Sequence, residues 1–200
     1  MMPEHISFKS DTIELVGLLE PNSPDRGVVI THPHPLYGGD MTNTVVSTIS
    51  EAYARREYSA LRFNFRGVGA SGGTHDDGQG EQQDVLAAVA YLKDRGVQSV
   101  DLVGYSFGAW VIAHAPIPAD ITRLILVSPP VAFMPFDQSL SLPTLTGVIT
   151  GSRDDFAPPG DIEKEMPGWN PSAKLTVIPE ADHFYSGCLQ QLESAVIDQI

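Results

Sequence analysis

Cysteine is almost absent from this sequence. Of its 200 residues only one, Cys188, is a cysteine. A single cysteine excludes an intrachain disulfide and a zinc site built from several cysteines. Cys188 also has no histidine or other base beside it in the sequence, so we expect a buried free thiol rather than a nucleophile. The fold must therefore be held together by packing.

Positive charge is also scarce. The chain has 12 Lys and Arg against 25 Asp and Glu, which gives a formal net charge of −13. Nucleic acids and anionic membrane surfaces are bound through clustered Lys and Arg, and the sequence contains no such cluster. We therefore expect no nucleic-acid partner and no membrane partner. Polyanionic substrates are disfavoured for the same reason, although less strongly.

Long apolar runs are missing as well. No stretch approaches the roughly 18 apolar residues that a membrane-spanning helix needs. The first ten residues, MMPEHISFKS, lack the basic start and the apolar run of a secretory signal. With 42% hydrophobic and 18% charged residues, the composition is that of an ordinary soluble enzyme. The sequence predicts a cytoplasmic protein whose residues 1–200 form one domain, and it leaves a homo-oligomer open.

Short apolar runs rich in β-branched residues recur along the chain, and turn residues separate them. We expect strands at 6–8, 12–19, 27–31, 60–65, 99–105, 123–128, 145–150 and 174–179. From the third run onward most are almost continuously apolar, which is typical of strands buried on both faces of a parallel sheet. The first two runs fit an antiparallel edge.

Helical patterns fill several of the gaps between these runs. We expect helices at 42–57, 81–96, 107–115 and 189–200. The second is the best defined, because Val85, Val89 and Leu92 follow helical spacing and Gly96 closes the segment. Alternating strands and helices predict an α/β fold with a mostly parallel central sheet and helices on both faces. Ligands of such sheets bind beyond the carboxyl ends of the strands.

One serine stands at such a strand end. The segment DLVGYSFGAW places Ser106 directly after a predicted strand and directly before a predicted helix. Gly104 and Gly108 flank it in a Gly-x-Ser-x-Gly pattern, and glycines at these positions allow the close backbone approach of a sharp strand–helix turn. The pattern alone leaves open a catalytic nucleophile or a junction of small residues.

A serine nucleophile needs a base and a group that orients the base. Residues of both kinds follow later strands. Asp154 and Asp155 both come after the strand that ends at Thr150, and one of them would orient the base. His183, the candidate base, comes after the last strand. The resulting order along the chain, Ser then Asp then His, is the order found in α/β-hydrolases.

The sequence resembles the α/β-hydrolase superfamily throughout its length. The segments THPHPLYGGDMTN and FNFRGVGASGG are similar to those of its small lidless bacterial serine hydrolases, which are usually described as predicted esterases. The resemblance aligns Gly151, Asp154 and Pro158 with the family motif after the seventh strand. It therefore implies Asp154 rather than Asp155 as the catalytic acid. It also matches His183, followed by an aromatic residue, to the family's loop histidine.

The same resemblance implies an oxyanion hole formed by two backbone N–H groups. Phe107, the residue after Ser106, supplies the first. The second would come from the loop THPHPLYGG, where the prolines have no N–H, so that His34 and Leu36 remain. The family position favours His34. The sequence has His32-Pro33 where the superfamily usually has His-Gly, and this departure affects the expected donor geometry.

Two other motifs in these loops have alternative interpretations. His32 and His34 could ligate a metal, but no third ligand stands at a supporting spacing, and a serine triad needs no metal and no cofactor. We expect His32 to hold neighbouring loops together. The segment RGVGASGG at 66–73 lacks the Gly-Lys-Ser/Thr ending of a phosphate-binding loop, and we expect Arg66 to brace it.

The sequence thus predicts a carboxylesterase that cleaves small-molecule esters through Ser106, His183 and Asp154. Only residues 129–144 join the sixth and seventh core strands, so no cap domain fits there, and an open pocket favours short or medium acyl groups. Phe133, Met134, Phe136 and Tyr37 would give it an apolar margin or belong to the core. Thioesterase, lactonase or peptidase activity on the same triad, or a catalytically silent binding protein, remain alternatives.

Overall fold

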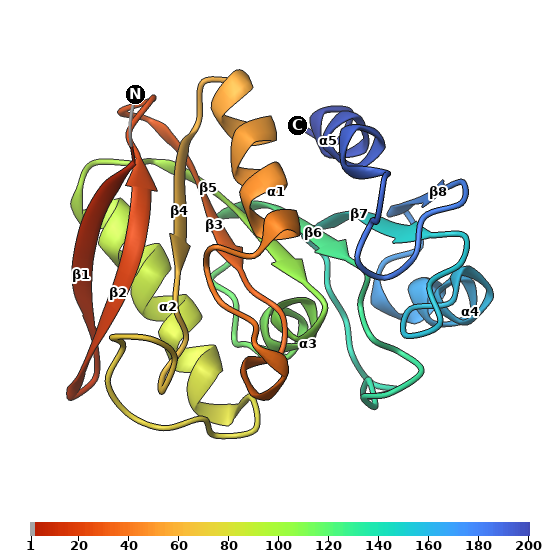
Figure 1. Ribbon diagram of the computed structural model, residues 1–200, viewed down its shortest axis with the longest axis horizontal. Helices are drawn as coiled ribbons and strands as arrows, with labels where there is room; N and C mark the ends of the chain where they lie inside the picture. Colours follow the sequence, from red (N-terminus) through yellow and green to blue (C-terminus); the bar gives the residue numbers. More distant parts are fainter. Residues whose placement is uncertain (1–2) are drawn as a thin grey trace.

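A computed structural model describes residues 3–200 and is organised around one eight-stranded sheet (Figure 1). Its strands are β1 (Glu4–Ser10), β2 (Ile13–Glu20), β3 (Arg26–Thr31), β4 (Ser59–Phe63), β5 (Ser99–Tyr105), β6 (Ile121–Val127), β7 (Leu145–Gly151) and β8 (Lys174–Ile178). They lie in the order β1-β2-β4-β3-β5-β6-β7-β8. β1 pairs antiparallel with β2, and β2 with β4, whereas all other pairs are parallel. The mostly parallel sheet with an antiparallel edge is confirmed.

Helices cover both faces of the sheet, as the sequence predicts. They are α1 (Thr44–Arg55), α2 (Gln79–Asp94), α3 (Phe107–His114), α4 (Pro159–Trp169) and α5 (Leu189–Ile197). α2, α3 and α4 pack on one face, and α1 and α5 pack on the other (Figure 1). A single 3-10 turn, Pro35–Tyr37, follows β3 within the described part of the chain.

Two elements depart from the expected pattern. The sequence pattern predicted no helix at α4, a segment that contains Pro159 in its first turn and Pro167 inside it. Proline is compatible with the first turn, where its missing N–H has no partner anyway. β4 ends at Phe63 instead of reaching 65, because the N–H of Phe65 donates to the His32 ring rather than to a strand.

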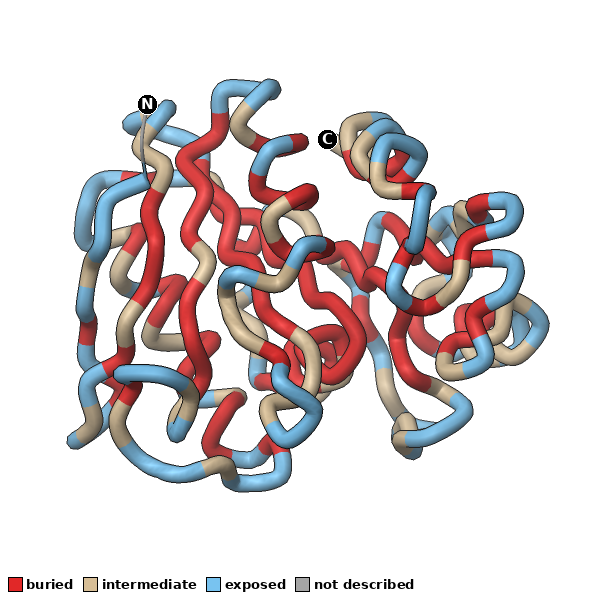
Figure 2. Tube along the Cα trace, in the orientation of Figure 1, coloured by how far each residue is buried: buried red, intermediate tan, exposed pale blue. Residues whose placement is uncertain are grey.

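The segment between β6 and β7 is irregular. Residues 129–144, between β6 and β7, contain turns but no helix and no strand. No cap domain is therefore inserted at this point. In Figure 2 the buried residues of the strands, in red, give way to mostly exposed or half-buried residues in this segment.

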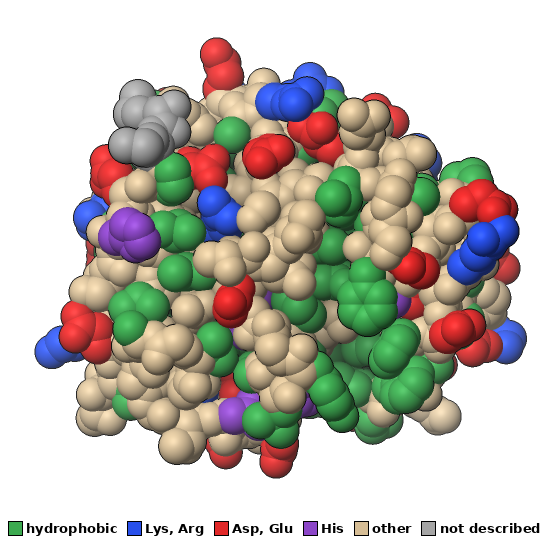
Figure 3. Space-filling model, in the orientation of Figure 1, with side chains coloured by type: hydrophobic (Ala, Val, Ile, Leu, Met, Phe, Trp, Pro, Cys, Tyr) green, Lys and Arg blue, Asp and Glu red, His purple; other side chains and the backbone are tan. Residues whose placement is uncertain are grey.

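Apolar side chains gather on one face of the molecule. Figure 3 shows hydrophobic groups gathered on the face where the loops after β6, β7 and β8 lie. Across residues 3–200, no helix has both the length and the apolar character required to cross a membrane.

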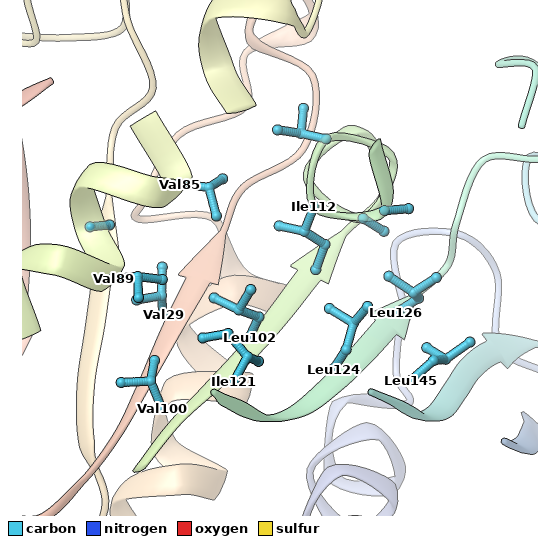
Figure 4. Close-up of a cluster of buried hydrophobic side chains, with 14 of the residues drawn as sticks. Val29, Val85, Val89, Val100, Leu102, Ile112, Ile121, Leu124, Leu126 and Leu145 are labelled. Atoms are coloured by element: carbon cyan, nitrogen blue, oxygen red, sulfur yellow. The ribbon is translucent and has the colours of Figure 1, made fainter. Parts of the chain in front are cut away.

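Alternating side chains of the central strands fill two hydrophobic clusters, one on each face of the sheet. Val29 and Leu102 point into the cluster beneath α2 and α3, together with Ile112 (Figure 4). Their neighbours Val28 and Val103 point to the opposite face, beneath α1 and α5. Because both faces are packed, the strands hold the loops at their carboxyl ends in fixed positions.

Candidate active site

Ser106 lies at a sharp turn between β5 and α3. Its backbone has φ 54° and ψ −120°, a conformation that side-chain-bearing residues rarely adopt and that is often found at functional sites. A Cβ atom on Gly104 would lie 2.5 Å from the carbonyl oxygen of Gly108. A Cβ on Gly108 would lie 2.5 Å from the Oγ1 of Thr31. Both glycines are therefore required for the turn that presents Ser106.

The structure brings Ser106, His183 and Asp154 together from three loops. His183 Nε2 lies 2.9 Å from Ser106 Oγ. The other ring nitrogen, Nδ1, lies 2.9 Å and 3.0 Å from the two carboxylate oxygens of Asp154. All three residues are buried, with exposed fractions of 8% for Ser106, 6% for His183 and 2% for Asp154. An unbroken hydrogen-bonded chain thus runs from a carboxylate through an imidazole to a hydroxyl.

Asp154 is held in place by its own loop. Its Oδ1 accepts hydrogen bonds from the backbone N–H groups of Phe156 and Ala157, at 3.0 Å and 2.9 Å. Burial opposes ionisation of Asp154, but hydrogen bonding to His183 and attraction to it outweigh burial, so the pKa of Asp154 lies below its ordinary value. The carboxylate is therefore ionised at neutral pH. Its neighbour Asp155 is exposed, and the carboxylate that is hydrogen-bonded to the imidazole is that of Asp154.

Aromatic rings surround His183, of which the sequence indicated only Phe184, the residue that follows it. The ring of Phe156 stacks on the imidazole with centroids 4.6 Å apart, and the ring of Phe184 meets it edge-on at 5.5 Å. The hydroxyl of Tyr105 donates to the backbone carbonyl of His183 at 2.9 Å. These contacts fix the position of the imidazole. The sequence offered one signal for the Phe156 contact, because Phe156 lies two residues after Asp154. The stacking itself depends on how the loops after β7 and β8 pack against each other.

The loop after β3 places backbone donors beside the turn at Ser106. The His34 ring lies 4.6 Å from the Phe107 ring, measured between centroids. Within residues 3–200, the N–H groups of His34 and Phe107 donate to no protein acceptor. The N–H of Leu36, in contrast, donates to His34 Nδ1 at 3.3 Å. Of the two candidate donors in this loop, His34 is therefore the one that keeps its N–H free.

Three other residues behave as the sequence suggested. The buried His32 accepts a hydrogen bond from Phe65 N–H at 3.0 Å and donates through Nδ1 to its neighbour's carbonyl, which joins two loops. Burial lowers the pKa of His32 to about 4, so the ring is neutral. Arg66 forms an ion pair of 2.8 Å with the buried Asp84 and thereby braces the loop that follows β4. Cys188 is a buried free thiol.

The predicted apolar margin divides into two groups. Phe133 and Tyr37 are exposed, with fractions of 67% and 89%. Met134 and Phe136 are half-buried and pack against the hydrophobic cluster of α2, α3 and α4, so they belong largely to the core. Throughout the described chain, no three His, Cys, Asp or Glu side chains are grouped so that they could hold a metal ion.

The fold and this arrangement define the class. A mostly parallel sheet, a serine on a strand–helix turn and the chain order Ser, Asp, His together describe the α/β-hydrolase fold. The model of the "Alpha/beta hydrolase family" matches residues 28–195. The chain belongs to this family.

Individual relatives agree with this assignment. An uncharacterized protein of Rickettsia prowazekii (strain Madrid E) is 32% identical over 191 residues, which cover 90% of this chain and 79% of the relative. An α/β serine hydrolase homologue from Coxiella burnetii superposes with a TM-score of 0.90 at 29% identity, covering 100% of this chain and 98% of its own. An α/β serine hydrolase without a lid from Xanthomonas campestris also has a TM-score of 0.90, at 27% identity, covering 100% and 94%. These similarities support a hydrolase.

Proposed function

We propose that this protein is a serine carboxylesterase that acts on short or medium acyl esters. Ser106 is the nucleophile, His183 the general base and acid, and Asp154 the residue that orients His183. The observation that carries the proposal is the hydrogen-bonded chain Asp154–His183–Ser106, with contacts of 2.9 Å on each side of the imidazole. The strained backbone of Ser106, with φ 54°, supports it, because conformations of this kind cluster at functional sites.

The reaction proceeds in two acyl transfers. His183 Nε2 takes the proton of Ser106 Oγ as that oxygen bonds to the carbonyl carbon of the ester. The bond to the alcohol oxygen then breaks, and the same proton passes from Nε2 to the departing alcohol. In the second half, His183 activates water, which releases the acid and restores Ser106. Asp154 keeps the Nδ1 proton in place and stabilises the imidazolium that forms in each half.

Negative charge that develops on the carbonyl oxygen needs donors. We assign these to the N–H groups of Phe107 and His34, which donate to no acceptor among residues 3–200. Phe107 is the first residue of α3, so the positive end of the helix adds a favourable potential at the same place. No metal or cofactor has a part in this mechanism.

The absence of an inserted cap supports the expected substrate size. Residues 129–144 contain no helix that could close over Ser106. Long acyl chains usually need a covered apolar tunnel, whereas an open site suits small esters.

We also propose that the chain acts as one domain, because both hydrophobic clusters lie against the same sheet.

The proposal is tested by p-nitrophenyl esters of increasing acyl length, from acetate to palmitate. We expect a burst of nitrophenol equal to one per active site and the highest kcat/KM at short or medium length. Ser106→Ala should remove the burst and the turnover. Hydrolysis confined to thioesters, lactones or peptides would move the activity to another substrate of the same triad, and no hydrolysis at all would favour a binding protein.

A further inference from the structure

The side chains around His183 carry information about the substrate beyond the proposed reaction. In that reaction, His183 Nε2 donates its proton to the departing alcohol oxygen. The alcohol part of the ester must therefore lie beside the imidazole when the bond breaks. Side chains that contact His183 on its accessible sides consequently border the alcohol part, whatever acyl group is bound.

Three phenylalanines occupy this position. Phe156 stacks on the imidazole at 4.6 Å with an interplanar angle of 30°, and Phe184 meets its edge at 5.5 Å. Phe133 stacks on Phe156 at 4.4 Å with an angle of 24°. The three residues come from the loops after β6, β7 and β8, on the face where apolar side chains gather in Figure 3. Together they form an aromatic wall that begins at His183 and extends outward.

Two members of this wall are unusually exposed. Phe133 is 67% exposed and Phe184 is 63% exposed, although each lies within one ring of the buried imidazole. Neither ring fills the core. Exposed aromatic side chains next to a reactive group are typical of a binding site. The other exposed large apolar side chains of the described residues come from other segments. Leu36 and Tyr37 lie on the 3-10 turn after β3, where Tyr37 contacts His34, and Val177 lies on the edge strand β8.

Charge near the wall excludes anionic groups. Asp155 is exposed beside Phe156, and Asp182 precedes His183. Backbone N–H groups that donate to Asp182 lower the pKa of its carboxyl, so it is ionised at neutral pH. The guanidinium of Arg153, the residue before Asp154, is paired with Glu180. A neutral group is therefore favoured at this place.

We infer that Phe133, Phe156 and Phe184 form a subsite for a neutral aromatic or bulky apolar alcohol. This inference rests on the proposed function and adds to it a preference for the alcohol part of the ester. The preferred substrates combine a small acyl group with an apolar alcohol, because the aromatic surface lies on the side where the proton is delivered.

Benzyl acetate and methyl phenylacetate test the inference directly. They are isomers of equal size and similar polarity, and they release alcohols of similar acidity. Only the side of the ester that carries the phenyl ring differs. We expect kcat/KM for benzyl acetate to exceed that for methyl phenylacetate by about tenfold or more, as for one well-placed apolar group.

Variants assign this preference to the wall. Phe133→Ala and Phe184→Ala should each lower the ratio of the two kcat/KM values, and the double variant should bring it to about threefold or less. Both side chains are exposed, so the fold should persist. Val177→Ala is the matched control, because it also shortens an exposed apolar side chain but lies within the strand β8 rather than in the loops that carry the wall, and it should leave the ratio unchanged.

The outcomes separate this inference from the proposed function. A ratio near one, a ratio that favours methyl phenylacetate, or a ratio unaffected by the double variant would overturn the subsite while leaving the esterase. Reaction of Ser106 with a fluorophosphonate without cleavage of either isomer would overturn the subsite as well. Absence of both cleavage and reaction would overturn the proposed function itself.

Discussion

Replacement of Asp154 by asparagine exchanges one oxygen for an NH₂ group and gives a sharp prediction. Asp154 Oδ1 accepts hydrogen bonds from two backbone N–H groups, those of Phe156 and Ala157. An asparagine must keep its carbonyl oxygen there, because an NH₂ group would face two donors. Its NH₂ group then takes the place of Oδ2, which lies 3.0 Å from His183 Nδ1. The carbonyl oxygen stays 2.9 Å from Nδ1, but the new NH₂ group competes as a donor to Nδ1, and the tautomer that accepts from it carries its proton on Nε2, pointing at Ser106 Oγ.

The size of the effect follows from this change of tautomer. An imidazole protonated at Nε2 cannot take the proton of Ser106, and the neutral amide introduced by Asp154→Asn cannot stabilise an imidazolium. In other serine triads, the same substitution lowers kcat by about 10⁴-fold. Here we expect a loss of about 10³- to 10⁴-fold, or about 4 to 5.5 kcal/mol in activation free energy at about 1.36 kcal/mol per factor of ten.

The assay is the steady-state hydrolysis of p-nitrophenyl acetate at neutral pH by the wild type, Asp154→Asn and Asp155→Asn. Asp155 is the neighbouring carboxylate but is exposed, whereas Asp154 is hydrogen-bonded to His183, so the Asp155 variant serves as the control. We expect Asp155→Asn to stay within about twofold of the wild type, as for a surface substitution. A loss below about tenfold for a folded Asp154→Asn protein would refute the reasoning, and an equal loss in both variants would assign it to the loop.

Two further predictions concern stability. His32 has a pKa of about 4 when folded, below its ordinary value of 6.5, so the unfolded chain takes up a proton first as the pH falls. The contribution of the neutral His32 ring to the free energy of unfolding is thus complete above about pH 6.5. It is lost as the pH falls toward about 4, by up to about 3 kcal/mol. Urea unfolding at about pH 7 and about pH 4.5 should show this loss, and a His32→Asn protein with an undiminished loss would disprove its origin in His32. Gly104→Ala places a Cβ 2.5 Å from the Gly108 carbonyl oxygen, and we expect a destabilisation of about 3 kcal/mol or more. Thermal unfolding measures it, with Gly160→Ala as the control because no atom lies near its Cβ, and a shift no larger than that of the control would contradict the required close approach.

The sequence predicted the sheet well because buried parallel strands leave a simple pattern. Each central strand is a short apolar run between turns, and β5 (Ser99–Tyr105) matches its predicted bounds. The helix α4 (Pro159–Trp169) was not predicted, and it contains two prolines, which are uncommon in helices. A signal was nevertheless present, since its buried residues Ile162, Met166 and Trp169 are spaced by four and three residues.

The candidate site was predictable where a residue type is tied to a strand end. Ser106, Asp154 and His183 each follow a strand, and their order along the chain restricts the choice. The contacts between loops were not predictable in this way. The aromatic wall of Phe133, Phe156 and Phe184 depends on the packing of three separate loops, and no spacing in the sequence relates those residues.

The central claim is that Ser106 is an activated nucleophile, and covalent labelling tests it most directly. The intact protein is treated with a fluorophosphonate, and the modified peptide is located by mass spectrometry, with Ser106→Ala and His183→Ala as comparisons. The account predicts one adduct per chain, on Ser106, and none in either variant. An adduct on another residue, or an unmodified wild-type protein under conditions that label a known serine esterase, would contradict it.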